Sequence, residues 1–233
     1  TGAQIAEELN ESGRKVYLSV GGVGRFPRRY RGRDAVDWAS LTGFFNRTPD
    51  MLPSPAARFG SNPTLTGKNG GHSLNMHQFY RDGIVLLGHA RSLADGRLTF
   101  EPDLKESLAK ADKSERDFIQ RVDDYIQAQG LSDPTDQIPQ LNDGYSAPQI
   151  LSLDLKAAGI STVIWACGFA FDFNLVKLPV FDSFGYPVTQ RGVTQFPGLF
   201  FLGLPWLYMM KSGLLMGVGE DAAYLAGKIV GRM

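Results

Sequence analysis

The chain has 233 residues, in which 24 lysines and arginines balance 24 aspartates and glutamates, so its formal net charge is zero. A neutral chain without clustered positive charge is not expected to bind nucleic acid. Its single cysteine excludes an intramolecular disulfide scaffold and any CxxC motif. No uncharged apolar run approaches the roughly 18 residues of a membrane-spanning helix, and the start lacks a signal peptide. These features predict a cytoplasmic protein without a membrane span.

The first part of the chain predicts helices and strands in alternation. It opens in an amphipathic helix in which Ile5, Ala6 and Leu9 share one face, and Gly13 suits the left-handed position that ends it. The next predicted elements are a buried strand over 15–20, a Gly/Arg-rich loop over 21–32, a helix over 34–45 capped by Asp34, a long connection over 48–71, a short helix over 74–81 and a strand over 84–88.

The remainder continues this alternation. A hairpin over 90–100 is predicted to turn at Asp95-Gly96. A long helix over 103–129 is predicted to begin with a capping box of Asp103 and Glu106, and to end at Gly130. The other predicted elements are a buried strand over 161–166, turns over 185–198, a strand over 199–202 and a final helix over 219–229. Alternating strands and helices predict an α/β fold.

The order of helix and then strand at the start is that of a βαβ unit without its first strand. In dinucleotide-binding units the first turn is rich in glycine, and the helix N-terminus meets the pyrophosphate. Gly2 stands where the last glycine of such a fingerprint would lie. We therefore expect a Rossmann-like fold that is incomplete at its N-terminus, as in a fragment of a larger protein.

The end of the first predicted strand indicates which dinucleotide binds. NAD-binding units place an acidic residue here, whereas this chain has Ser19 followed by Arg25, Arg28 and Arg29. Hydroxyl and guanidinium groups suit a 2′-phosphate, so the pattern favours NADP over NAD. The alternative is that these arginines form a solvated surface or pair with the aspartates that follow.

Several short segments, taken in order, resemble one family. They are TGAQIAEEL at 1–9, YLSVG at 17–21 with RRYRGRD at 28–34, VIWACGF at 163–169 and FPGLFFLGL at 196–204. Together they resemble the flavin-containing monooxygenases and their bacterial relatives, which include Baeyer–Villiger-type enzymes and oxidoreductases associated with cation-efflux operons. The resemblance spans nearly the whole chain. It departs at Cys167, which stands where the family's Ala-Thr-Gly motif usually has threonine.

The resemblance implies a flavoprotein with two nested dinucleotide-binding domains. Residues 1–165 would form the NADPH-binding domain without its first strand, and 166–233 the C-terminal part of the FAD-binding domain. The FAD fingerprint and the monooxygenase motif would lie in an N-terminal half of the same protein. The residues expected at NADPH are Thr1, Gly2, Gln4, Ser19, Arg25, Arg28, Arg29, Cys167 and Gly168. Those expected at FAD are Gly203, Leu204, Trp206, Gly217, Gly219 and Asp221.

Near the C-terminus, residues 217–222 match the pattern GxGxxA formally, but too little chain follows for a second strand with its acid. The better interpretation is a helix N-terminus that faces the flavin ring, whose reduced form is anionic. The alternative is helix packing that requires small residues. Among the aromatic residues, Trp206 is the candidate for the active-site side.

The implied activity is transfer of hydride from NADPH to FAD, followed by activation of O2 to oxygenate a small organic substrate. No catalytic residue stands out, because the cofactor carries the chemistry. Two alternatives remain open: a non-catalytic NADP(H)-binding sensor or scaffold, and a flavin reductase that passes electrons to a partner. A dithiol reductase would need a second cysteine.

The three histidines lack the spacing of a metal site, so no metal is expected. Asn75, His77 and Gln78 are candidates for the cofactor cleft, with the capping of turns as the alternative. Cys167 is expected as a packed residue at a strand end. The charged helix over 103–129 is expected to be a half-solvated cover or the contact of a homodimer.

Overall fold

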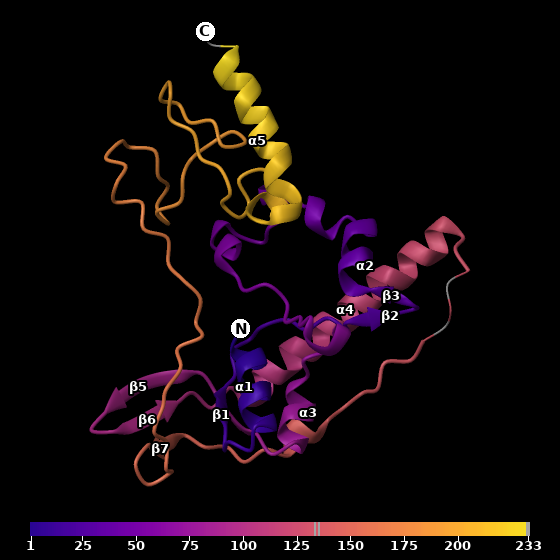
Figure 1. The fold of residues 1–233 in the computed structure, drawn as a ribbon, viewed down its shortest axis with the longest axis vertical. Helices are drawn as coiled ribbons and strands as arrows, with labels where there is room; N and C mark the ends of the chain where they lie inside the picture. The colour runs from indigo at the N-terminus through magenta and orange to yellow at the C-terminus, as the bar shows by residue number, and fades with distance from the viewer. Residues whose placement is uncertain (133, 135, 232–233) are drawn as a thin grey trace. The chain divides into compact units, whose positions relative to one another are not determined.

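The chain folds into two compact units, shown in the computed structural model of Figure 1. The structure describes residues 1–132, 134 and 136–231. The first unit consists of Thr1–Ala35 and Ser61–Gly168, and the second of Val36–Gly60 and Phe169–Met233. Helices and small sheets are both present, which confirms the α/β class. None of the described helices is long and apolar enough to cross a bilayer.

The first unit is built around two parallel strands, β1 (Tyr17–Ser19) and β4 (Val85–Leu87). Their side chains join those of α1 (Gly2–Glu11), α3 (Met76–Arg81) and the start of α4 in one apolar core. Apolar residues fill these strands because a parallel pair is covered by helices. The buried members of the core are Ala3, Ala6, Val16, Val20, Leu74, Phe79, Ile84, Leu86, Leu104, Leu108 and Ala147.

The predicted hairpin is confirmed as β5 (Ala90–Ala94) and β6 (Arg97–Phe100). Its turn has positive φ at both central residues, 49° at Asp95 and 73° at Gly96, which is the geometry that an Asp-Gly pair favours. A third strand, β7 (Ser152–Asp154), pairs antiparallel with β6. The sequence did not predict β7, because its few residues have no clear apolar alternation.

The long helix α4 (Leu104–Gln129) lies where it was predicted and ends at Gly130, whose φ is 60°. Leu108, Phe118 and Val122 are buried along its apolar stripe. The predicted capping box is wrong, because the Asp103 side chain makes no capping hydrogen bond. Its carboxylate binds His89 instead.

The predicted Gly/Arg-rich loop contains a small hairpin that the sequence did not predict. Its strands are β2 (Arg29–Tyr30) and β3 (Arg33–Asp34), joined through Arg31 and Gly32 at φ 47° and 73°. The following helix α2 (Ala35–Leu41) ends earlier than predicted. The long connection after it forms short 3₁₀ turns: η1 (Phe44–Asn46), η2 (Pro49–Met51), η3 (Pro55–Phe59) and η4 (Lys68–Gly70).

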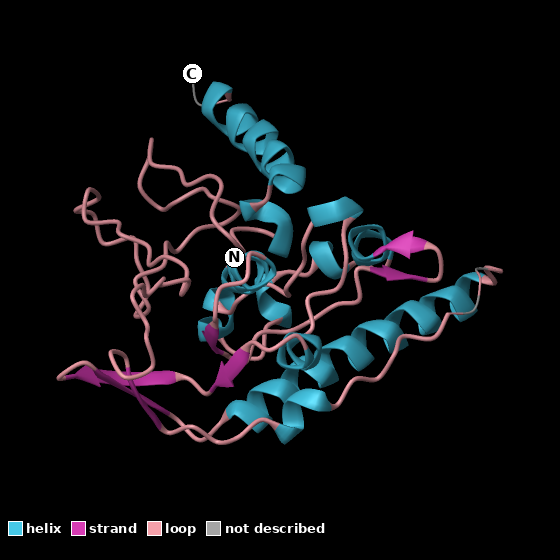
Figure 2. Cartoon of the chain, turned by 60° about the horizontal axis from the view of Figure 1, so that its bottom comes forward, coloured by secondary structure: helices cyan, strands magenta, loops and turns pink. Residues whose placement is uncertain are grey.

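The second unit, as far as the structure describes it, consists of helical turns and loops without a named strand (Figure 2). Its final helix α5 (Leu215–Val230) begins four residues before the predicted start and follows the turn η6 (Met210–Gly213). The strand predicted over 199–202 is wrong, since only an isolated bridge joins Phe200 to Val193. Stacked and edge-on rings connect Phe171, Phe173, Phe181 and Phe201.

The buried strand predicted over 161–166 is also wrong. These residues are exposed and have no regular secondary structure, and the Trp165 side chain is 66% exposed. A strand forms only where a neighbour satisfies its backbone. Within the described residues, β1 pairs with β4 alone and no strand lies along 161–166. The apolar run over 161–166 therefore does not form a strand, because no neighbouring strand pairs with it.

Candidate functional site

The carboxyl ends of β1 and β4 form one edge of the parallel pair. The N-terminus of α1 lies toward the same edge, because Asn10 near the other end of the helix donates to the Asp82 carbonyl just before β4. In α/β sheets, ligands bind at this edge. The first turn of α1 carries no acidic residue, and Thr1 makes no capping side-chain bond. Its first backbone N–H groups therefore present partial positive charge, which suits an anion.

The segment 166–168 lies next to the start of α1. A β-carbon placed on Gly2 would lie 3.1 Å from the Ala166 β-carbon, so a larger residue at position 2 would press against it. Cys167 and Gly168 are exposed. The expectation that Cys167 packs at a strand end is therefore wrong, because the strand is missing. The Gln4 side-chain amide donates to the Leu65 carbonyl at 3.2 Å.

Ser19 lies at the end of β1 and binds the backbone beyond β4. Its hydroxyl donates to the Gly88 carbonyl at 2.8 Å and accepts from the Ala90 N–H at 3.2 Å. Because the single hydroxyl proton is used, Ser19 has only acceptor capacity left for a ligand.

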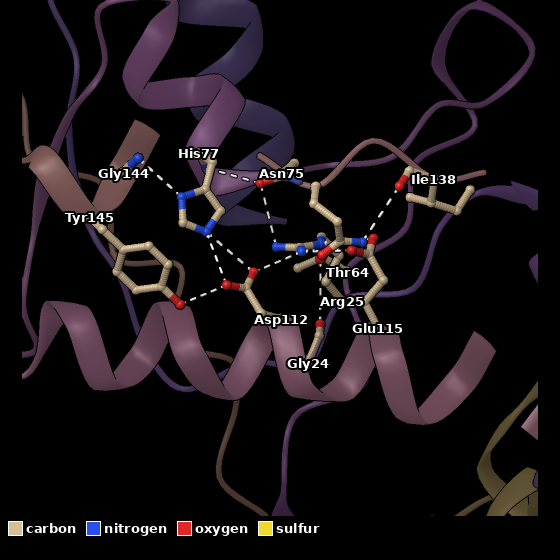
Figure 3. Close-up of polar contacts among 11 residues, drawn as sticks. Gly24, Arg25, Thr64, Asn75, His77, Asp112, Glu115, Ile138, Gly144 and Tyr145 are labelled. Carbon is tan, nitrogen blue, oxygen red and sulfur yellow. Dashed lines mark hydrogen bonds and ion pairs between the residues drawn. The ribbon is translucent and has the colours of Figure 1, made fainter. Parts of the chain in front are cut away.

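Arg25 lies in a buried polar network rather than at the surface (Figure 3). Its guanidinium donates to both Glu115 oxygens at 3.0 and 2.8 Å and to Asp112 at 2.8 Å. Burial by itself would lower the pKa of Arg25, but hydrogen bonds and charge from Glu115 and Asp112 raise it above the ordinary value. Its charge is already balanced by two carboxylates, so we do not retain Arg25 among the residues proposed for a phosphate.

Arg28 and Arg29 also have partners within the first unit. Arg28 forms an ion pair with Asp34 at 2.8 Å, which is the alternative that the sequence left open. Arg29 is exposed and donates to the Gly70 carbonyl at 3.0 Å. The structure thus divides the predicted arginines among three different settings instead of gathering them at one phosphate.

Asn75, His77 and Gln78 surround the start of α3. The Asn75 side chain caps the helix by accepting from the His77 N–H at 2.9 Å, so the capping alternative is confirmed for Asn75. The Gln78 amide donates to Asp82 at 2.7 Å. The His77 side chain is fully buried and continues the Arg25 network.

The hydrogen bonds of His77 fix its tautomer. Its Nδ1 accepts from the Gly144 N–H at 3.0 Å, so the ring proton belongs on Nε2, which faces Asp112 at 3.2 Å (Figure 3). Tyr145 donates to the other Asp112 oxygen at 2.6 Å. Burial first, then this bond, raises the pKa of Tyr145 to about 12. Burial opposes ionisation of Asp112, but Tyr145 and Arg25 outweigh it and lower the Asp112 pKa.

A second histidine–aspartate pair lies at the carboxyl edge of β1 and β4, and the sequence did not predict it. Asp103 accepts from the His89 backbone N–H at 3.0 Å and binds its ring Nδ1 at 2.5 Å. Burial works against ionisation of Asp103, but these bonds from His89 lower its pKa below the usual value. The side chains are 49% and 33% exposed, so a ligand can reach them.

Two glycines lie against this pair and the neighbouring face of α4. A β-carbon on Gly21 would lie 3.3 Å from His89 Nε2, and one on Gly22 would lie 3.6 Å from Lys110 Nζ. Both glycines were predicted only as part of a Gly/Arg-rich loop, without a role of their own; a glycine pair directly after Val20 is the signal of close backbone approach that could have identified them. His89 had no such signal, because Asp103 matched a helix-cap pattern equally well.

The residues predicted at FAD lie in the second unit, around the start of α5. Gly203 and Trp206 have positive φ, 78° and 64°, and the Trp206 conformation is rare for a bulky residue. A β-carbon on Gly217 would lie 2.3 Å from the Lys211 carbonyl, so only glycine fits there. The other predicted residues are the half-buried Leu204, the exposed Gly219 and the buried Asp221.

Two features of this second site bear on whether it can bind an anion: the charge at the start of α5 and the state of the Asp221 carboxylate. The first turn of α5 holds no acidic residue, which suits an anionic group. The Asp221 carboxylate is already paired with Arg191 at 2.9 Å. In the described residues no cluster of three metal-ligating side chains forms.

Comparison with known proteins gives relatives by sequence. The chain is 30% identical over 232 residues to an "Uncharacterized oxidoreductase CzcO-like" of Geobacillus kaustophilus, a match that covers 99% of this chain and 50% of that protein. Matches of 36% identity over 84 residues link it to proteins named "Uncharacterized oxidoreductase CzcO" in Bacillus velezensis and Bacillus subtilis, covering 24% of each. The chain spans about half the length of its longest-matching relative. No protein-family model and no solved structure matches it.

Proposed function

We propose that this chain is the nucleotide-binding part of an FAD- and NADPH-dependent oxidoreductase of monooxygenase type. Relatives named as oxidoreductases over nearly the whole chain indicate a redox function. The observation that carries the finer proposal is the carboxyl edge of β1 and β4. There an uncapped helix N-terminus free of acidic residues and a glycine pair flanked by basic side chains lie at the place where α/β sheets bind nucleotides.

The first unit would bind NADPH through its phosphates. Gly2 and the first turn of α1 would accept the pyrophosphate, because the backbone N–H groups there are directed at the edge. Residues 166–168 would cover the other side, since Ala166 lies against Gly2. NADPH supplies the hydride when bound; this unit positions it and adds no nucleophile or base.

The second unit would contribute to the FAD site. The turn through Gly203 and Trp206 and the small residues at the start of α5 provide the close backbone approach that a planar ring requires. The rest of that site would come from the part of the relatives' length that this chain does not span. The substrate and the use of O2 belong to this proposal as well.

The proposal is tested on the purified full-length protein, which includes the part of the relatives' length that this chain does not span, by its visible absorption spectrum before and after anaerobic addition of NADPH. Flavin bands that bleach with NADPH, and far more slowly with NADH, are the expected result. Bands that persist would remove NADPH as the reductant. A protein without flavin bands, even after incubation with FAD, would contradict the flavoprotein part.

A second measurement, the amount of oxygenated product formed per NADPH consumed, separates a monooxygenase from a flavin reductase. In a monooxygenase, NADPH consumption in air yields oxygenated product in proportion. NADPH consumption without such a product, but with reduction of an added electron acceptor, would favour a flavin reductase instead.

A further inference from the structure

We propose that His89 and Lys110, not the arginines after β1, bind the 2′-phosphate of NADPH and set the preference over NADH. This inference rests on the proposed function and adds residues to it. It names a histidine–lysine pair in the position where nucleotide-binding units of this type use an arginine.

The orientation of His89 supports this role. Asp103 holds both its backbone N–H and its ring Nδ1, so the ring is fixed and its other nitrogen, Nε2, faces Gly21. The Asp103 carboxylate accepts from Nδ1–H, and a phosphate at Nε2 would offer a second acceptor to a ring that carries a proton on each nitrogen. His89 Nε2 can then donate to an anion that lies over the glycines.

Lys110 supplies a second positive group at the same two residues. Its Nζ lies 3.6 Å from the β-carbon position of Gly22, and Lys110 forms no ion pair in the described part of the chain. A phosphate dianion between the His89 ring and the Lys110 ammonium would accept a hydrogen bond from each of them. Side chains larger than hydrogen at Gly21 and Gly22 would occupy that space.

The competing donors at this edge are already in use. Arg25 is buried against two carboxylates, and Arg28 is paired with Asp34. The Ser19 hydroxyl donates its proton to the Gly88 carbonyl, so it has no proton left for a phosphate oxygen. Arg29 donates to the Gly70 carbonyl, whereas His89 and Lys110 are the basic side chains that lie against the glycine pair after β1.

The charges around His89 are few. Asp103 faces it from the start of α4, and Lys110 lies further along the same helix. Directly after β6, the Glu101 N–H donates to the His89 carbonyl, while the Glu101 carboxylate lies 3.5 Å from Arg91. No second carboxylate is paired with the ring in the described part of the chain, so a phosphate would not meet direct repulsion at Nε2.

The test is calorimetric titration of the protein with NADP+ and with NAD+ at pH 7. The unaltered protein is expected to bind NADP+ at least about tenfold more tightly than NAD+, equivalent to one charge-assisted hydrogen bond. His89→Asn retains a donor toward Asp103 but loses Nε2 and the positive charge. His89→Asn and Lys110→Ala are each expected to remove most of that preference by weakening NADP+ binding. Lys105→Ala, an exposed lysine on the same helix, is the matched control and should retain it.

The outcomes separate this inference from the proposed function. Preference for NADP+ that survives both substitutions would overturn the role of His89 and Lys110 and leave NADPH binding intact. Equal binding of the two dinucleotides by the unaltered protein would also overturn it. Binding of neither would overturn the proposed function itself, and the inference with it.

Discussion

The first unit contains two histidine–aspartate pairs that use the same chemistry in opposite ways. His77 is fully buried against Asp112, and both its ring nitrogens have protein partners. His89 is half exposed against Asp103, and its Nε2 faces a glycine pair. In the buried pair every polar atom is used by the fold, so its effect should be on stability. The exposed pair keeps one donor for a ligand, so its effect should be on binding.

The largest expected effect separates the two pairs by unfolding. Asp112→Ala removes the carboxylate that His77, Tyr145 and Arg25 share. We expect a loss of about 3 kcal/mol in unfolding free energy, at the low end for a broken buried pair because Glu115 still binds Arg25. Urea unfolding measures it, with the exposed Lys113→Ala as control. A loss below about 1 kcal/mol would contradict the structural role.

Two glycine substitutions compare the pairs directly, because Gly144 lies against the His77 ring and Gly21 lies against the His89 ring. A methyl group on Gly144 would lie 3.0 Å from His77 Nδ1 and 3.1 Å from Leu108, both buried, so Gly144→Ala should cost about 1–3 kcal/mol. A methyl group on Gly21 would lie 3.3 Å from the exposed His89 ring and 4.0 Å from Val23, which is an ordinary contact distance. Gly21→Ala should therefore change stability by under about 0.5 kcal/mol while weakening NADP+ binding. Equal stability losses in the two variants would contradict the distinction between a structural His77 pair and a ligand-binding His89 pair.

A smaller effect comes from the phenol of the buried network. Tyr145→Phe removes one donor from Asp112 but leaves Arg25 and His77 in place. We expect a loss of about 1 kcal/mol in urea unfolding. Tyr80→Phe is the control, because that hydroxyl makes only a long 3.5 Å bond at the surface. Similar losses for both tyrosines would show that the Asp112 contact adds nothing.

The smallest expected effect is on the pH dependence of stability, measured as the difference in unfolding free energy between the unaltered protein and Asp112→Asn. The folded state lowers the Asp112 pKa, so its ionised form stabilises the protein above the unfolded pKa, and this contribution is lost as pH falls through the folded pKa. The stability difference between the unaltered protein and Asp112→Asn should therefore be constant near neutrality and shrink below about pH 4. Thermal unfolding at a series of pH values measures it. A difference that grows with acid would have the wrong sign.

Local patterns allowed much of the first unit to be predicted. The amphipathic stripe of α1, the Asp95-Gly96 turn and the Gly130 end of α4 each depend on residues a few positions apart. The parallel pairing of β1 with β4 agrees with a βαβ arrangement. Such features follow from periodicity and turn chemistry, which need no knowledge of distant contacts.

Three of the misses depend on contacts between residues that are distant in the sequence. The apolar run over 161–166 has the composition of a strand but no neighbour to pair with. Arg25 resembles a phosphate ligand until Asp112, 87 residues away, is found beside it. Asp103 matches a helix cap until His89 competes for its carboxylate. Composition predicts which side chains suit a phosphate, but only the fold shows which of them are already bound.

The most direct test of the account is nuclear magnetic resonance of the three histidine rings during titration with NADP+. The resonances of His89 should shift on binding, and much less with NAD+, while those of the buried His77 should not move. His72, which binds Glu7 at 2.6 Å, provides an internal reference. Shifts at His77 with none at His89, under conditions where NADP+ binds, would contradict the division between a structural pair and a ligand-binding pair.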